Sequence, residues 1–233
     1  MQHVVEAVTW YVAFLFSVTA HEAAHAWCAK RGGDLTAYHG GQVTLDPWPH
    51  IRREPVGMVL LPLVSLFLIQ WPFGYASAPY DPFWAERHPR RAAFMSLAGP
   101  LANLALTVLA GLVIRVGIAA GPLASPTSAS MTHVASAARN EGLWVGGAMF
   151  LSMLFSLNLM LALLNLLPLP PLDGSDAVTL LMNEDTATRF RHFVRNPAFA
   201  WIGLLIAWRL FGPLFDPVFT FALNILYPGA HYG

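Results

Sequence analysis

Long apolar runs separated by short polar stretches dominate the pattern along the chain. Residues 92–114 contain no charged side chain over 23 positions, and residues 143–172 contain none over 30 positions. A helix needs about 20 apolar residues to cross a bilayer. The pattern therefore predicts transmembrane helices at about 92–117 and 143–167, after a first apolar helix at about 4–29.

Two further apolar stretches are shorter or interrupted. The stretch 56–69 has only 14 residues and contains Gly57 and Pro62, which favours a re-entrant or interfacial segment over a full crossing. The region at about 198–227 forms either one kinked span or two shorter pieces, because five residues interrupt it: Arg209, Gly212, Pro213, Asp216 and Pro217.

The polar residues 30–53 after the first helix are expected to form a loop. Within them, residues 40–46 (GGQVTLD) alternate between polar and apolar positions and favour a short β-strand, whose edge could hold an extended peptide by main-chain hydrogen bonds. The predicted fold is an all-α polytopic membrane protein. It is a transmembrane helix bundle of about four to six membrane segments with a short membrane-associated β-strand or re-entrant region.

Composition narrows the class of protein. Of the 233 residues, 56% are hydrophobic and 11% are charged, which is too apolar for a soluble domain of this size. The net charge of zero gives no basic face for nucleic acid, and the single cysteine, Cys28, excludes an internal disulfide or a multi-cysteine metal cluster. No Lys or Arg precedes the first apolar run, so we expect a retained helix and not a cleaved signal peptide. We expect one membrane-embedded domain over residues 1–233, with a core at about 4–180 and C-terminal membrane segments at about 198–227.

A cluster of ionisable residues lies near the end of the first apolar helix, in the sequence TAHEAAHAWCAK at residues 19–30. His21 and His25 are four positions apart, so both imidazoles share one face of a helix and can bind one zinc ion, with Glu22 beside the water that such a metal activates. Each ionisable side chain in a span costs about 2.5–3.5 kcal/mol on insertion scales, and this cost favours a functional role over ordinary packing. A catalytic zinc needs a third protein ligand.

A second candidate stretch, NLLPLPPLDGSD, occupies residues 165–176. Its prolines end the preceding helix and place Asp173 on irregular backbone, which membranes tolerate only where it is buried in protein or lines a wet cavity. Taken alone, the stretch also fits an ordinary Pro-rich helix end with an Asp-Gly turn. Its occurrence beside the His-Glu-x-x-His pattern favours a metal site.

The combination of motifs resembles the site-2 protease family of intramembrane zinc metalloproteases. The resemblance rests on the His21 motif, on Asn165-x-x-Pro168 with Asp173-Gly174, and on SLAGPLANL at residues 96–104. Residues 40–51 are similar to a strand of the compact family members, and FGYASAPYDP at residues 73–82 is similar to their proline-containing loop. The chain is similar to the compact type, without PDZ or CBS domains.

The resemblance implies one Zn²⁺ per chain bound by His21, His25 and Asp173, with Glu22 as general base. Asn103 and Asn165 are candidate donors to the oxyanion of the reaction, although either amide could instead form a helix–helix hydrogen bond. The implied partners are membrane lipid and a single-pass membrane-protein substrate, for example an anti-sigma factor or a leftover signal peptide. A regulatory partner and a homo-oligomer both remain open.

Topology adds an argument that is independent of the resemblance. The His motif ends the first helix and Asp173 follows the span 143–167, so both helix ends must lie on one side of the membrane, and residues 30–91 must leave and return to that side. The loops on this side carry ten of the thirteen basic residues, which makes it cytoplasmic by the positive-inside rule: Lys30, Arg31, Arg52, Arg53, Arg87, Arg90, Arg91, Arg189, Arg191 and Arg195. Arginine is frequent and lysine nearly absent, which suggests a prokaryotic cell membrane.

The sequence is compatible with three functions. The first is an active intramembrane metalloprotease that cuts within or near a transmembrane segment. The second is a catalytically idle relative with a binding or regulatory role in a membrane complex. A zinc transporter is the third, and it is disfavoured because no repeated halves support alternating access.

Overall fold

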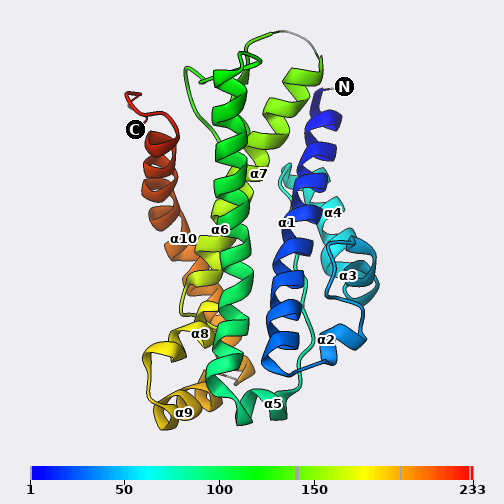
Figure 1. Cartoon of the computed structure of the whole chain (residues 1–233), viewed down its shortest axis with the longest axis vertical. Helices are drawn as coiled ribbons and strands as arrows, with labels where there is room; N and C mark the ends of the chain where they lie inside the picture. The colour runs from blue at the N-terminus through cyan, green and yellow to red at the C-terminus, as the bar shows by residue number, and fades with distance from the viewer. Residues whose placement is uncertain (1, 140–141, 195, 231, 233) are drawn as a thin grey trace.

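Four long apolar helices form the body of the molecule (Figure 1). The computed structural model describes residues 2–139, 142–194, 196–230 and 232. Within them, four helices are long and apolar enough to cross a membrane: α1 (Gln2–Gly32), α6 (Pro89–Ala119), α7 (Gly142–Leu166) and α10 (Pro197–Leu226). The predicted all-α polytopic bundle is confirmed, and the chain is an integral membrane protein.

Helix α6 lies at the centre of the bundle and packs against both α1 and α7. One apolar core joins α6, α7 and α10, and a second joins α1, α4 and α7. Helix α10 is continuous although it contains Pro213 and Pro217, so the region at about 198–227 is one span and not two pieces. It is the least buried of the four helices.

The chain between α1 and α6 makes an excursion that returns to the same end of the bundle. After α2 (Thr36–His39) and α3 (Pro47–Arg53), a π-helical turn (Val56–Leu60) leads into α4 (Leu61–Ile69). The chain then runs back along the lower half of α1 to α5 (Pro82–Arg87). The apolar helix Val56–Ile69 is too short to span, as predicted.

The predicted strand at residues 40–46 is wrong. Gly40 and Gly41 form a turn, with Gly41 at a φ of +72°, and bends follow. The Thr44 hydroxyl accepts a hydrogen bond from the Asp46 N–H, and the Asp46 carboxylate accepts one from the Trp48 N–H at the start of α3. These local hydrogen bonds replace the pairing that a strand would need. In the described part of the chain, strands occur only in the connection between α6 and α7, where β1 (Leu123–Ala124) pairs antiparallel with β2 (Ser136–Ala137).

The arrangement satisfies the parity argument. Helices α5 and α9 (Glu184–Val194) lie at the end of the bundle where α1 finishes and α6 begins, whereas the β1–β2 connection lies at the other end. Two short elements, α8 (Gly174–Ala177) and a 3-10 turn (Val178–Leu181), link α7 to α9. The basic residues of the α1 terminus, α5, the start of α6 and α9 therefore gather at one end. Arg195 lies outside the described residues.

Candidate metal centre

The two histidines come from consecutive turns of α1 and point to one spot. Their Nε2 atoms lie 2.9 Å apart, and both residues are 7% exposed. A side chain four positions along a helix lies on the same face, so an unbroken α1 is what brings the imidazoles together.

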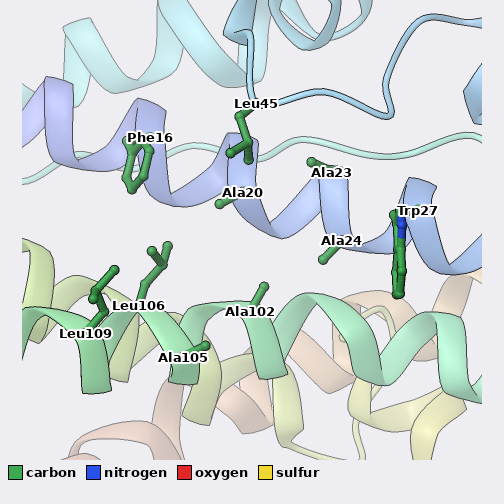
Figure 2. A pocket seen from close by; sticks show the side chains of 10 residues that line it. All are labelled: Phe16, Ala20, Ala23, Ala24, Trp27, Leu45, Ala102, Ala105, Leu106 and Leu109. Atoms are coloured by element: carbon green, nitrogen blue, oxygen red, sulfur yellow. The ribbon is translucent and has the colours of Figure 1, made fainter.

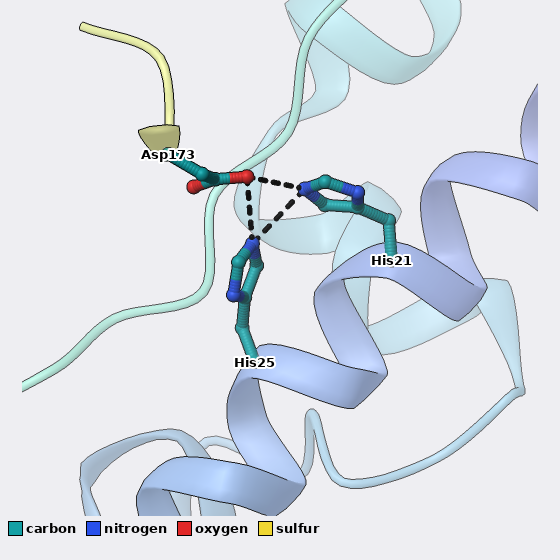
Figure 3. A group of neighbouring side chains, drawn as sticks. All are labelled: His21, His25 and Asp173. Carbon is teal, nitrogen blue, oxygen red and sulfur yellow. Dashed lines mark hydrogen bonds and ion pairs between the residues drawn. The ribbon is translucent and has the colours of Figure 1, made fainter. Parts of the chain in front are cut away.

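Asp173 reaches the histidines from the irregular segment after α7. Helix α7 ends at Leu166, just before the Pro-rich stretch, and Asp173 is the residue that precedes α8. Its Oδ2 lies 3.0 Å from Nε2 of His21 and 3.3 Å from Nε2 of His25 (Figure 3). The next residue must be glycine, because a Cβ there would overlap the carbonyl oxygens of Leu166 and Leu167. The three predicted ligands thus converge, with one ligand atom from each within 4.8 Å of the others.

The hydrogen bonds around the imidazoles fix which nitrogens face the centre. Nδ1 of His25 lies 2.7 Å from the carbonyl oxygen of Met95, and Nδ1 of His21 lies 2.5 Å from Oδ1 of Asn103. Both partners are acceptors, so each Nδ1 carries its proton and each neutral ring turns the lone pair of Nε2 toward Asp173. Three electron-rich atoms that face one another need a cation between them, and the arrangement therefore fits a metal ion.

The carboxylate of Asp173, which lies beyond the end of α7, is stabilised by its neighbours. When no metal ion is bound, protons on the Nε2 atoms of the histidines take the place of the cation, and their charge and hydrogen bonds outweigh burial and hold the pKa of Asp173 below its usual range. A ligand carboxylate that is already ionised loses no proton when it binds a metal.

Glu22 lies in the same turn of α1 and is 5% exposed. Its carboxylate interacts electrostatically with His25. A buried carboxylate costs free energy unless it is paired or has a functional role, so its position beside the ligand group agrees with the role expected of it.

Asn103 contacts the site in a way that differs from the sequence expectation. Its Nδ2 donates one hydrogen bond to Oδ1 of Asn158 at 2.7 Å and a second to the carbonyl oxygen of Ser17 at 3.3 Å, and all three residues are fully buried. Both amide hydrogens are therefore committed, which leaves none for a substrate oxyanion. The oxyanion role expected for Asn103 conflicts with these contacts, and we assign it instead to positioning His21.

Asn165 lies one residue before the end of α7 and is half-buried. Its Nδ2 donates a hydrogen bond to the carbonyl oxygen of Leu161, one helical turn back. This bond uses only one of its two amide hydrogens, so Asn165 stays a candidate oxyanion donor.

Sequence reasoning missed the residues behind the ligands. Asn158 Nδ2 donates to the hydroxyl of Ser17 at 2.8 Å, and that hydroxyl donates to the carbonyl oxygen of Ala13. This chain of hydrogen bonds ties α7 to α1 through the partner of His21. Its one visible signal was a lone amide, Asn158, in the middle of an uncharged span. The carbonyl of Met95 left no signal, since any residue supplies one.

Gly99 of α6 lies directly against the ligand group. A Cβ at this position would overlap Nε2 of His25 and would lie 2.5 Å from Nε2 of His21. Only the absence of a side chain therefore keeps the space beside the two nitrogens open.

An apolar groove also runs between α1 and α6, with a volume of about 380 Å³. Figure 2 shows Ala20 and Ala24 of α1 facing Ala102 and Ala105 of α6 across it. It includes none of the four chemical residues, because positions 20 and 24 lie about 100° around α1 from the two histidines. The groove therefore carries no chemistry of its own.

Comparison with known proteins agrees with this site. The family model described as peptidase family M50 matches residues 9–207. The chain is 32% identical to "Putative zinc metalloprotease YwhC" of Bacillus subtilis (strain 168), over 70% of this chain and 64% of that protein. It is 34% identical to "Putative zinc metalloprotease Rip2" of Mycobacterium tuberculosis (strain ATCC 25618 / H37Rv), over 83% of this chain and 63% of that protein. The chain thus covers less than two thirds of the length of these relatives. No solved structure matches it.

The family match spans most of the chain and includes the His-Glu-x-x-His helix and the Asp173 turn. On this basis, the chain belongs to peptidase family M50, the site-2 protease family.

Proposed function

We propose that the protein is an intramembrane zinc metalloprotease that hydrolyses a peptide bond within or near a transmembrane segment of a membrane-protein substrate. The observation that carries the proposal is the convergence of His21, His25 and Asp173, with Glu22 beside them, inside a membrane helix bundle. Two imidazole nitrogens and one carboxylate oxygen are a donor set that suits a catalytic Zn²⁺, which keeps a fourth position open. The relatives are named as putative zinc metalloproteases, which supports zinc as the metal.

The roles of the residues follow from their positions. Zinc, when bound, activates a water molecule and polarises the substrate carbonyl. Glu22 accepts the proton of the attacking water and returns it to the leaving amine nitrogen. Asn103 and the Met95 carbonyl hold the two imidazoles in the orientation that binding requires.

A helical substrate must unwind before its carbonyl is accessible, and the unwound segment needs hydrogen-bond partners. Residues 72–81, which connect α4 to α5 without forming a helix or a strand, are suited to this task. Gly74 packs against Phe14 in the middle of α1, and the Asp81 N–H donates to Asp34 just beyond its end. The segment between these two contacts, which we call the strap, therefore passes alongside the part of α1 that carries His21 and His25. No described backbone hydrogen bond occupies Ala76 or Ala78, so both can pair with an added strand.

The proposed location is the cell membrane with the site toward the cytoplasm. The support is the distribution of basic residues, which gather at the end of the bundle where the ligands lie. Substrates with helix-breaking residues near the cytoplasmic boundary are expected to be cut best.

The test is cleavage of a panel of tagged single-pass membrane segments by the protein in proteoliposomes, with zinc content measured in parallel. We expect Glu22→Gln to lower the cleavage rate by at least about 100-fold, because it removes the general base, while one zinc per chain remains. Glu6→Gln, the same substitution on the same helix, is the matched control and should cut normally. If the wild-type protein holds zinc and cuts no segment, the idle-subunit function replaces this proposal.

A further inference from the structure

Helix α10 presents two opposite charges on a surface that no described residue covers. Arg209 and Asp216 are both exposed and lie within the span Ala198–Leu226. Each is at least ten residues, or about 15 Å, from either end of α10. The hydrocarbon core is about 30 Å thick and covers roughly 20 helical residues, so both charges fall within the middle part of the helix.

The two charges share one face of α10. Seven residues complete nearly two turns, so Arg209 and Asp216 point in directions only about 20° apart, with Gly212 between them. Gly212 is exposed, and a Cβ there would have no neighbour within 4 Å. A small residue between two polar ones allows the backbone of another helix to approach closely.

Up to Pro217, this face is opposite to the residues that α10 buries; nearer the C-terminal end of the helix, Leu223 lies on nearly the same face as Asp216 and is buried. Ala207 is 2% exposed and lies about 200° around the helix from Arg209. Gly203, whose backbone packs against the carbonyl of Pro170 near the metal ligands, lies about 120° from Arg209. The charged face therefore points away from the catalytic centre.

Charged side chains in contact with lipid are costly and normally pair within the protein. Neither Arg209 nor Asp216 has a hydrogen-bond or ion-pair partner among the described residues. A partner outside the described residues would offset the free-energy cost of both charges if it carried an opposite charge at the depth of each.

A second copy of this chain does not meet that condition. Two copies related by an axis along the membrane normal have parallel α10 helices. Arg209 would then lie level with Arg209, and Asp216 level with Asp216, so like charges would repel.

We propose that this face of α10 binds a transmembrane helix of another membrane protein, one that carries an acidic residue at the depth of Arg209 and a basic residue at the depth of Asp216. The partner docks away from the metal centre, so it acts as an associated subunit and not as the peptide being cut. The proposal does not depend on catalytic activity.

The test uses designed single-pass probes in proteoliposomes with the intact protein, read out by fluorescence energy transfer. The complementary probe is a Leu/Ala helix with Glu at the level of Arg209, Gly at the level of Gly212 and Arg at the level of Asp216, and a basic flank fixes its orientation. The matched control probe has the Glu and Arg exchanged. We expect the complementary probe to bind about tenfold more tightly, since two favourable polar contacts in a membrane together give about this factor.

The doubly substituted protein Arg209→Glu/Asp216→Arg should reverse the preference, and binding of the exchanged probe would also show that this variant is folded. Arg209→Leu/Asp216→Leu should bind both probes equally. If the wild-type protein binds the two probes with equal affinity, or binds neither, the proposal is wrong. Self-association of the wild-type protein that the doubly substituted protein loses would equally overturn it, in favour of a homo-oligomer.

Discussion

Substitution of Gly99 by alanine should remove metal binding with little effect on the helix bundle. The added Cβ would lie 2.5 Å from Nε2 of His21 and 2.6 Å from its Cε1, and it would also overlap Nε2 of His25. Ordinary contacts between such atoms are about 3.5–4.0 Å, so both imidazoles would have to move by about 1 Å. Metal sites tolerate ligand displacements of only about 0.2 Å.

The expected loss of zinc affinity is at least about 100-fold, or about 2.7 kcal/mol, because removing an outer-shell contact alone costs 10–100-fold and here two ligands move. The substitution should not lower the stability of α6 itself, because alanine is favoured over glycine by about 1 kcal/mol in a helix. The assay is competition with a chromophoric zinc chelator, with the melting temperature recorded in detergent.

Gly111→Ala in the same helix is the matched control, because its Cβ would contact the Phe155 ring at 3.4 Å without overlap. It should bind zinc normally. Wild-type zinc affinity in Gly99→Ala would refute the idea that the lack of a side chain at position 99 keeps the metal site open.

Three more substitutions test the supports of the site. Asn158→Leu removes the acceptor of Asn103 and should lower zinc affinity about 10–100-fold, and an unchanged affinity in the chelator assay would contradict the positioning role. Arg191→Met removes a buried guanidinium that pairs with Asp176 and donates to the carbonyl oxygens of Ala85 and Pro89. Unfolding in detergent should show a loss of about 3 kcal/mol, and Arg191→Lys should restore less than half of it because one ammonium cannot reach all these acceptors. Asp34→Ala breaks a carboxylate hydrogen bond to the Asp81 N–H, so limited proteolysis within residues 72–81 should become about tenfold faster, whereas an unchanged rate would mean that Asp34 does not anchor this strap.

The sequence predicted most of the membrane helices and pointed to the three residues that the fold brings together, for two physical reasons. Bilayer thickness sets the length of an apolar run, so three of the four spans were visible as runs of the right length. The cost of charge in a span made His21, Glu22 and His25 stand out. The family resemblance supplied Asp173, and parity then required residues 30–91 to return to the same side of the membrane. Whether Pro213 and Pro217 divide the last apolar region could not be decided from the sequence, because a proline inside a helix can either kink or end it, and the structure has one continuous helix there.

What the sequence could not supply were contacts between distant elements. The alternation in residues 40–46 indicated a strand, but a strand needs a partner, and local capping by Thr44 and Asp46 prevailed. Asn103 looked like an oxyanion donor until its amide hydrogens were located on Asn158 and Ser17. The role of Gly99 depends on how closely α6 approaches α1, which no local pattern encodes.

The ligand set is split across 148 positions of chain, since Asp173 follows His25 at that separation. During synthesis and membrane insertion, α1 and α6 can therefore be complete long before the centre exists, and the site forms only when the segment after α7 returns to the end of α1. A metal captured at that moment binds the assembled bundle and not its precursors, and so stabilises the final arrangement by mass action. Metal loading would thus mark the completion of membrane assembly, because an unfinished chain has no complete ligand set.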